Sequence, residues 1–495
     1  PNKRFILNIL FYHKPLVMKN RLLWSTLLLA AALTTASCSS DDTPAAEPTF
    51  EFTTGVETGM PVMVVPGTPT TLTYKAEHLA GLTAEALPQG WDIAIDPAAG
   101  SITLEAADDA ASKAVLRLSA TGSAAQQPLC EVELRCLNTF DDPAGTFILN
   151  EGNMTTENGS LTYISPEGYV LDDAYRTVNG SELGNVAQDM AFCDGKIYVI
   201  SQNGNKNANG TEFENDGMLV VMDARTLKRT AAFTNDDLAG LDWPSHIAVL
   251  DEQHIYIRDN AGVHRLDGET GTLTFVEGSE DAPKSRFVTM NGKVYTYLSG
   301  YISKIYEISP ESDAVNSIRL PLTGIECDIN EVLGIQAADD GRMWIMTFGF
   351  GKTAMNKFDL STQDIVQRQI NIKPTAGASG VAFAAHDNLV YYADGTTIYR
   401  LPFDESAKLD AASGLDAVEL LTDVSGLDPN AGQLYNGLGV HPATGHLLIN
   451  SIKSFALFTQ NQIWAFDPAG DFLSPLAKYE NYTNFPAGFF FPENR

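Results

Sequence analysis

The chain has 495 residues, which is more than one ordinary domain holds and predicts two or three domains. Hydrophobic residues make up 44% of the chain, enough for a large core, so a generally disordered protein is excluded. The net charge of −30 at pH 7 repels phosphate backbones and therefore argues against a nucleic-acid partner, although acidity can also serve solubility alone.

Residues 1–37 are expected to be an upstream extension followed by an export signal. From Met18 the sequence reads MKNRLLWSTLLLAAALTTASC, in which basic residues precede an apolar run and small residues lead to Cys38. That run is shorter than the roughly 20 residues that cross a bilayer, as is typical of a cleaved signal. The last four residues resemble a lipobox, although the usual Leu three places before the cysteine is absent. This resemblance implies that Cys38 is lipidated and anchors the chain to a membrane.

Residues 38–48 hold the predicted lipidated cysteine and a polar tether, SSDDTPAAEP after Cys38. The acidic stretch resembles the export tag of surface lipoproteins in gut bacteria. That likeness implies an outer-membrane location in which the protein faces the cell exterior.

Residues 49–138 are predicted to form a small β-sandwich. Short apolar runs separated by turn residues are typical of such a domain, and they lie at 49–54, 70–76, 91–95, 101–106, 114–120 and 129–137. The stretch LPQGWDIAIDPAAGSITLEA resembles the immunoglobulin-like modules of such lipoproteins, and a spacer role is expected. Cys130 and Cys136 are too far apart along one strand to bond each other. These two, Cys193 and Cys327 are expected to be unpaired, small apolar residues.

From residue 145 onward, the sequence repeats. A turn followed by an apolar and aromatic strand recurs at GKIYVI, QHIYIR, GKVYTY, GRMWIM, NLVYYA and GHLLIN, and TFILN matches the strand half. The mean spacing of the seven copies is about 50 residues, the length of a four-stranded propeller blade. A second strand follows each copy and ends in Asp or Ser before a turn, as in GMLVVMDART and NQIWAFDPAG. These Asp and Ser side chains are expected to cap the turns.

A third, innermost strand precedes each copy except the first. It is apolar or small, as in MAFCD, PSHIAVL and SGVAFAA. The missing copy is found at the other end of the chain, in NFPAGFFF. We therefore predict that the C-terminus supplies the inner strand of the first blade and closes the ring, which removes exposed sheet edges. The predicted fold is all-β, with a seven-bladed β-propeller over 145–495 after an immunoglobulin-like β-sandwich.

The propeller region, with FILNEGNMTTENGSLTYISPEG and YRTVNGSELGNVAQDMAFCDGKIYVISQN, resembles the YncE-like surface propellers of gut bacterial lipoproteins over about 70% of the chain. That family includes lipoproteins that capture corrinoids such as vitamin B12 and pass them to a TonB-dependent outer-membrane transporter. The resemblance implies the fold, and only loosely a small-molecule ligand of the corrinoid class and such a transporter as partner.

The predicted binding surface consists of the loops that join second to third strands and of the loops between blades. These loops are rich in amides and aromatics, which suits a large, flat, polar ligand. The candidate ligand-binding residues are Asn150, Gln188, Asn203, Trp243, His246, Arg258, Tyr301, Phe348, Phe350, Tyr435, Asn450 and Asn484.

Each of the more distinctive candidates also has a purely structural interpretation. Trp243 could fix the strand that begins at Pro244, His246 could be a satisfied inner-strand histidine, and Arg258 could pair with Asp259 or another acid. The Asn-rich loop from Ser201 to Gly210 is either a lid or a plain solvated loop.

No catalytic residues, metal ligands or cofactor sites are predicted. Gly351-Lys352-Thr353 lacks the spacing of a phosphate-binding loop, the acidic pairs lack calcium-loop spacing, and the eight histidines show no metal-ligand spacing. The leading hypothesis is therefore a surface lipoprotein that binds a ligand for a transporter. The alternatives are a structural or adhesive surface-layer protein that binds a protein or glycan, and a propeller enzyme such as a lactonase or quinoprotein.

Overall fold

A computed structural model describes residues 48–121, 129–207, 210–374, 382–406 and 413–492. The predicted signal, Cys38 and almost all of the tether therefore lie outside the described residues, as do parts of the Asn-rich loop and of the predicted strand at 379–385. Within the described part, the protein is built from nine four-stranded sheets, three short α-helices and one 3-10 helix, Phe455–Leu457. None of those helices is long and apolar enough to cross a membrane.

The first eight strands form two sheets that share one core. One sheet has the order β1 (Thr49–Thr54), β3 (Thr70–Glu77), β6 (Ser101–Ala106) and β5 (Trp91–Asp96). The other has the order β2 (Val62–Val64), β8 (Cys130–Cys136), β7 (Lys113–Ala120) and β4 (Leu82–Ala84). Alternate residues of the two sheets, such as Leu72, Leu104, Leu116 and Leu134, are fully buried in this core. Strands β2 and β4 are only three residues long and were not predicted.

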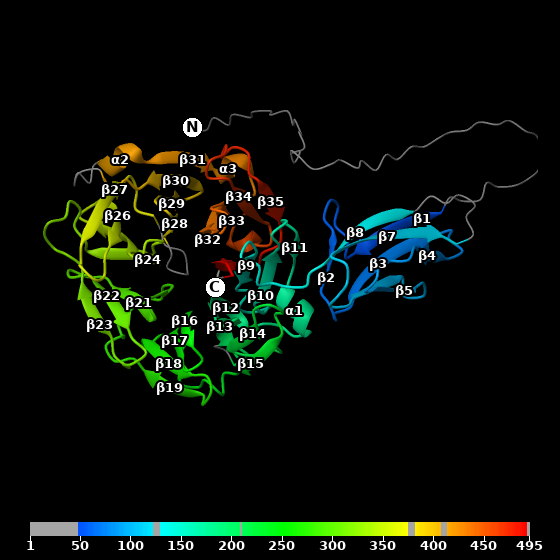
Figure 1. Ribbon diagram of the computed structural model, residues 1–495, viewed down its shortest axis with the longest axis horizontal. Helices are drawn as coiled ribbons and strands as arrows, with labels where there is room; N and C mark the ends of the chain where they lie inside the picture. Colours follow the sequence, from blue (N-terminus) through cyan, green and yellow to red (C-terminus); the bar gives the residue numbers. More distant parts are fainter. Residues whose placement is uncertain (1–47, 122–128, 208–209, 375–381, 407–412, 493–495) are drawn as a thin grey trace, which may run out of the picture. The chain divides into compact units, whose positions relative to one another are not determined.

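The other seven sheets surround a common centre in Figure 1. Six of them are made of four consecutive antiparallel strands, and the first strand of each lies nearest the centre. In chain order, the first two of these sheets are β12 (Asn185–Cys193), β13 (Lys196–Gly204), β14 (Leu219–Asp223) and β15 (Arg229–Phe233), and then β16 (His246–Asp251), β17 (His254–Arg258), β18 (Val263–Asp267) and β19 (Thr272–Phe275). The next two are β20 (Val288–Met290), β21 (Lys293–Leu298), β22 (Lys304–Ile308) and β23 (Asn316–Arg319), and then β24 (Glu331–Ala337), β25 (Met343–Gly349), β26 (Lys352–Phe358) and β27 (Ile365–Ile370). The last two are β28 (Phe383–His386), β29 (Leu389–Asp394), β30 (Thr397–Pro402) and β31 (Glu419–Asp423), and then β32 (Gln433–Val440), β33 (Leu447–Ile452), β34 (Asn461–Phe466) and β35 (Ala477–Glu480).

The seventh sheet joins the two ends of this region. It has the order β11 (Val170–Leu171), β10 (Ser160–Ile164), β9 (Thr146–Asn150) and β36 (Pro486–Phe490). Phe489 lies opposite Ile148 in the register of β36 and β9. The prediction that the C-terminal strand pairs with the first strand of the repeat is therefore confirmed. Strand β36, drawn in red, lies near the centre of the ring (Figure 1).

The Asp and Ser residues that follow the third strands cap their turns, as predicted. The Asp223 carboxylate accepts from the backbone N–H of Thr226 at 2.8 Å, and that of Asp467 accepts from Ala469 at 2.8 Å. Ser165 Oγ accepts from the Tyr169 N–H at 3.3 Å. Each cap satisfies a backbone donor that the strand pairing leaves unused.

The short helices lie between strands, where the chain passes over the ends of the sheets. Helix α1 (Ala174–Asn179) precedes β12, and the Asp173 side chain at its N-cap accepts from the Arg176 N–H at 3.4 Å. Helices α2 (Ser413–Ala417) and α3 (Val424–Leu427) flank β31. None of the four cysteines in the described part forms a disulfide bond, and Cys193 and Cys327 are buried.

Candidate functional site

The antiparallel order of the strands places two sets of loops at the same end of every sheet. Loops between the second and third strands start there, and so do the loops that connect one sheet to the next. We call this end the loop face and the opposite end the turn face. All the candidate residues predicted from sequence belong to the loop face or to the strand ends beside it.

Exposed aromatic side chains gather on the loop face. Among the described residues, four aromatics are exposed, and all four are on these loops: Trp243 (41% exposed), Tyr301 (80%), Phe350 (80%) and Phe455 (64%). Met154, Leu322 and Leu457 are also exposed there. Exposed aromatic groups of this size are not explained by packing, and their concentration on one face makes the loop face the candidate binding surface, although exposed Leu420 and Leu473 lie elsewhere.

Two of these aromatics have backbone conformations that L-residues rarely adopt. Trp243 has φ 53° and Phe350 has φ 44°. The carbonyl of Trp243 accepts from Lys284 Nζ at 3.1 Å, and next to it the Asp242 N–H donates to Asp259 at 2.9 Å. A left-handed backbone at a bulky residue is kept only where its surroundings impose it, and such positions concentrate at binding sites.

Five of the predicted ligand-binding residues are buried instead. They are Asn150, Asn203, His246, Arg258 and Asn450, each 6% exposed or less. The Arg258 guanidinium donates to the carbonyl of Ala282 at 2.8 and 2.5 Å and to that of Gly262 at 3.0 Å. It therefore fastens two loops to the end of its own strand and does not pair with Asp259 through a hydrogen bond, which was one interpretation of the sequence.

Two of the buried amide side chains, Asn150 and Asn203, likewise hydrogen-bond neighbouring groups of the fold. Asn150 donates to Ser160 and Thr162 at 3.2 and 3.1 Å and accepts from the Asn484 N–H at 3.0 Å. Asn203 donates to Asn185 at 2.8 Å. His246 lies 2.9 Å from Ser245 Oγ, in agreement with a satisfied inner-strand histidine. Both side-chain atoms of Asn450 are buried without a hydrogen-bond partner among the described residues.

The remaining candidates are partly buried. Phe348 lies with Lys373 Nζ 4.2 Å above its ring, and that lysine also pairs with Glu331 at 2.6 Å. Asn484 donates to Glu157, and its carbonyl oxygen is buried without a partner among the described residues. Gln188 and Tyr435 meet at a residue that was not selected from the sequence, Glu151.

Glu151 lies where the first and last sheets meet on the loop face. The Tyr435 hydroxyl donates to its carboxylate at 3.0 Å, and Gln188 also hydrogen-bonds it. Burial raises the pKa of Glu151 to about 7, and the hydrogen bonds from Tyr435 and Gln188 only partly oppose this rise. The ring of Phe485 lies 5.3 Å from that of Tyr435 and stacks on Phe458 at 4.2 Å. A titratable carboxyl, amides and aromatic faces are thus combined at this junction.

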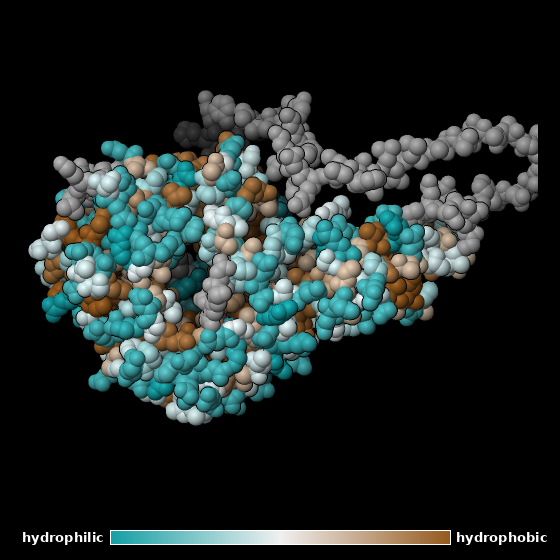
Figure 2. Space-filling view, viewed as in Figure 1, coloured by the Kyte–Doolittle hydropathy of each residue, from teal (hydrophilic) through white to brown (hydrophobic). Residues whose placement is uncertain are grey.

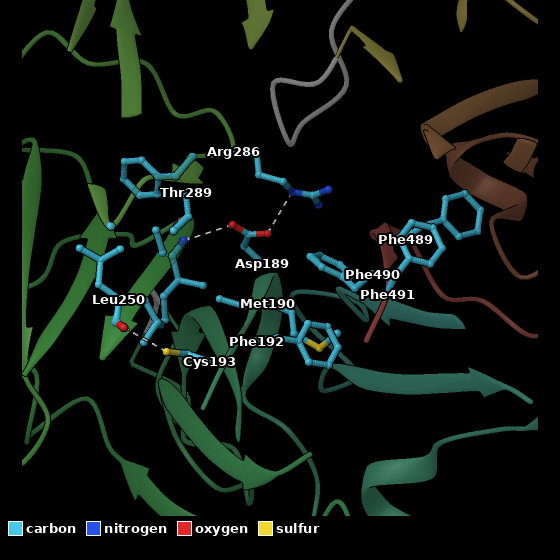
Figure 3. A pocket seen from close by; sticks show the side chains of 16 residues that line it. Asp189, Met190, Phe192, Cys193, Leu250, Arg286, Thr289, Phe489, Phe490 and Phe491 are labelled. Atoms are coloured by element: carbon cyan, nitrogen blue, oxygen red, sulfur yellow. Dashed lines mark hydrogen bonds and ion pairs between the residues drawn. The ribbon is translucent and has the colours of Figure 1, made fainter. Parts of the chain in front are cut away.

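A cavity of about 440 Å³ lies on the axis, between the inner strands β36, β12, β16 and β20 (Figure 3). Most of the residues that line it are apolar or aromatic, among them Phe192, Met190, Phe489, Phe490 and Phe491, but slightly more than half of the surface that they present to the cavity is polar. Its polar end is an ion pair between Arg286 Nε and Asp189 at 3.2 Å. Asp189 is 1% exposed and also accepts from the Ile247 N–H at 3.2 Å. Burial raises the pKa of Asp189, and Arg286 opposes this effect.

The space-filling view shows a hollow near the centre of the ring and a surface that is mostly hydrophilic, in keeping with the net charge of −30 (Figure 2). Asp189 and the cavity were not predicted, and only the neighbouring Gln188 was selected. The cause is local: the pairing of β12 with β13 shifts register twice between Asn185 and Asp189. Such bulges change which residues point inward, so the alternation of the sequence does not tell which side chain lines the axis.

One group of possible metal ligands occurs in the described part of the chain. Oxygen and nitrogen atoms of Asp339, His386 and Asp387 lie within 4.8 Å of one another, and the two aspartates are exposed. The Asp387 N–H already donates to Asp339 at 2.6 Å, which explains the proximity of the two residues without an ion.

Residues 144–492 match a protein family described as Domain of unknown function (DUF5074). The chain belongs to this family. The match covers the seven sheets of the ring and excludes the two sheets of residues 49–136. No curated protein matches the chain.

Several solved structures show a distant similarity to this DUF5074 protein. One is a quinonprotein alcohol dehydrogenase-like protein from Bacteroides thetaiotaomicron, with 14% identity and a TM-score of 0.49, covering 90% of this chain and 99% of that chain. Another is a protein from Lactobacillus plantarum, with 14% identity and a TM-score of 0.43 over 70% of this chain and 99% of that chain. A luciferin-regenerating enzyme has 14% identity and a TM-score of 0.32 over 48% and 76%. At these identities and TM-scores the likeness supports no statement about function.

Proposed function

We propose that this protein is a surface-exposed lipoprotein whose loop face binds a ligand and passes it to a TonB-dependent outer-membrane transporter. In this proposal the seven sheets are the blades of a seven-bladed, YncE-like propeller, and the preceding sandwich is an immunoglobulin-like spacer. The observation that carries the proposal is the position of the four exposed aromatics, which all lie on the loop face.

The chemistry of the loop face favours a broad, flat ligand. Trp243, Tyr301 and Phe350 offer ring faces, and the partly buried Gln188 on inner strand β12 offers an amide. A corrinoid presents a flat macrocycle edged with amides, which such groups recognise. A cavity of about 440 Å³ suits much smaller molecules, so a corrinoid would lie across the loops and not inside the axial cavity.

We propose binding and not catalysis. Asp189 is the carboxylate among the residues that line the axial cavity, and it is held by Arg286 and by the Ile247 N–H. An acid held in this way is poorly placed to take a proton from a substrate. The buried Arg258 and Asn150 likewise satisfy backbone and side-chain groups of the fold.

Calorimetric titration of the protein with cobalamin tests the ligand. We expect a 1:1 complex that weakens at least tenfold in Tyr301→Ala and Phe350→Ala, because each loses a stacking face. Leu473→Ala is the matched control, since Leu473 is 68% exposed but lies between β34 and β35 on the turn face. Absence of heat with cobalamin and with other corrinoids would contradict the corrinoid proposal.

The anchor is tested separately. We expect the full chain, expressed in a Gram-negative host, to incorporate a labelled fatty acid and to fractionate with the outer membrane, and Cys38→Ser to abolish both. Protease treatment of intact cells then reports which side of the membrane the protein faces. Labelling that persists in Cys38→Ser would show that the anchor is elsewhere or absent.

A structural or adhesive role is the second candidate, and one observation favours it. The exposed apolar side chains of the loop face are spread over several sheets, from Met154 in the first to Phe455 in the last, which suits an extended protein or glycan partner. Crosslinking through a photoreactive residue at position 350 would distinguish the candidates. A crosslinked surface polymer, together with corrinoid titrations that give no heat of binding, would favour an adhesive role.

A further inference from the structure

The axial cavity has a polar end that the fold leaves incompletely satisfied. Arg286 donates through Nε to Asp189 at 3.2 Å, and its guanidinium lies 4.4 Å above the ring centre of Phe490. Its Nη2 atom is buried and has no hydrogen-bond partner among the described residues. The guanidinium thus has donor capacity that the fold does not use, and an acceptor brought by a ligand can reach the 29% of the Arg286 side chain that is exposed.

The backbone beside Arg286 leaves space for this arrangement. A methyl group at Gly488 would lie 2.6 Å from Arg286 Nη2, and no other group approaches it as closely. Gly488 therefore permits the guanidinium to lie flat against β36, with Phe490 beneath it. In Figure 3 the Arg286 side chain lies next to that of Asp189, and a dashed line marks the interaction between them.

The charges define the ligand further. Asp189 is already engaged by Arg286 and the Ile247 N–H, so the cavity has little attraction for a cation. Arg286 keeps donor capacity, and a guanidinium matches the two oxygens of a carboxylate. Most of the other lining residues are apolar or aromatic, Phe192, Phe489 and Phe491 among them, and the polar part of the surface includes no further cationic side chain for a phosphate.

We infer that the axial cavity is a second binding site, which takes a small monocarboxylate with a flat apolar body. The carboxylate is bound by Arg286, and the apolar body packs between the phenylalanines of β36 and β12. A cavity of about 440 Å³ is in the range of sites for small organic ligands. Thr289 and Gly292 line the cavity and are exposed, so solvent reaches it from the turn face.

This site includes none of the exposed aromatics of the loop face, although Arg286 belongs to the loop between β19 and β20. The exposed aromatics belong to loops at one end of the sheets, whereas Thr289 and Gly292 lie at the turn between β20 and β21. Binding of a carboxylate is therefore expected to leave binding of cobalamin unchanged, and either site can fail its test without the other.

Saturation-transfer NMR and calorimetry on the full chain test the inference, with indole-3-acetate as the probe. We expect 1:1 binding that is at least tenfold tighter than that of uncharged 3-methylindole, and no binding of inorganic phosphate at the same concentrations. The variants are Arg286→Lys, which loses the two-pronged contact, and Gly488→Ala, which displaces the guanidinium. Each is expected to weaken indole-3-acetate binding tenfold or more.

Arg400→Lys is the matched control. Arg400 also pairs with a carboxylate, Glu419 at 2.6 Å, and lies over a phenylalanine ring, Phe472 at 5.7 Å, but it does not line the cavity. Its substitution is expected to leave binding unchanged. Wild-type protein that binds no indole-3-acetate, or binds 3-methylindole equally well, would overturn the inference. So would folded variants at positions 286 and 488 that bind as tightly as the wild type. If both variants fail to fold, binding of indole-3-acetate, 3-methylindole and inorganic phosphate to the wild type decides whether the inference holds.

Discussion

Two four-stranded sheets of the ring are assembled from the chain in different ways. The sheet of β16 to β19 is made from 30 consecutive residues, His246–Phe275, joined by short turns. The sheet of β36, β9, β10 and β11 joins strands from opposite ends of the region, and the Asn484 N–H donates to an Asn150 side chain 334 residues away. A local sheet can form early, whereas the closing sheet requires the whole ring to be in place.

The difference is also seen in the side chains that support each sheet. In the local sheet, Arg258 binds carbonyls of its own loops. In the closing sheet the bonds cross between the ends: Thr162 donates to the Tyr482 carbonyl at 2.8 Å, and the Glu151 N–H donates to that of Phe485 at 2.8 Å. Ile148 and Phe489 also pack in one cluster with Leu448 and Ile463 of the last sheet. The comparison teaches that disruption of the closing sheet should affect the whole ring, and disruption of the local sheet one part of it.

The largest effect is expected when β36 is removed. A chain that ends at residue 483 loses Ala487, Phe489 and Phe490, which are all buried, and leaves β9 with an unpaired inner edge. We expect loss of most of the free energy of unfolding, with early, non-cooperative melting in circular dichroism and a tendency to aggregate. A chain that ends at residue 492 retains β36 and should melt like the full chain. Equal melting curves for the two truncations would contradict the role given to the closing sheet.

How far the sequence predicts these features depends on whether they repeat. The strand order, the capped turns and the pairing of β36 with β9 follow from a pattern that recurs about every 50 residues, so each copy supports the others. Short strands such as β2 and β4 have no such support, because three residues carry too little alternation to be recognised.

The candidate site is only partly predictable for the same reason. The exposure of Trp243, Tyr301 and Phe350 follows from their loop positions. Whether a polar side chain such as Arg258 points to solvent or back to its own loop depends on tertiary contacts that no local pattern encodes. Glu151 and Asp189 acquire their surroundings from strands more than 50 residues away, as the bond from Tyr435 to Glu151 illustrates.

A smaller, local effect is expected from Arg258→Ala. The substitution leaves the carbonyls of Ala282 and Gly262 without their donor in a buried place and removes a large side chain. We expect a loss of about 2–4 kcal/mol in the free energy of unfolding, measured by urea titration. Arg176→Ala is the control, because Arg176 pairs with Glu182 at 2.9 Å on the surface with 62% of its side chain exposed. That change should cost less than about 0.5 kcal/mol. Equal losses in the two variants would show that the loop bonds of Arg258 contribute little.

The smallest effect is expected at the junction of the first and last sheets, and it depends on pH. Burial raises the pKa of Glu151 to about 7, above its ordinary value of 4.5. The folded protein thus holds the proton more tightly than the unfolded chain does, so the ionised carboxylate destabilises the fold above pH 7. This cost disappears as the pH falls through the interval from 7 to 4.5. Glu151→Gln removes the charge and keeps the shape, and it should raise the free energy of unfolding at pH 8 by on the order of 1–3 kcal/mol.

Urea titrations of both proteins at pH 8, 6.5 and 5 measure this difference, which should shrink steadily toward the lowest pH. Tyr435→Phe supplies the opposite control: it removes the hydroxyl that donates to the carboxylate at 3.0 Å, so the pKa of Glu151 should rise further. That variant should be less stable than the wild type, and by more at pH 8 than at pH 5. A Gln variant whose stability differs from the wild type by the same amount at all three pH values would show that Glu151 is not titrating in this range. The junction of the closing sheet would then be stabilised by its strand pairing and packing alone, as the local sheets are.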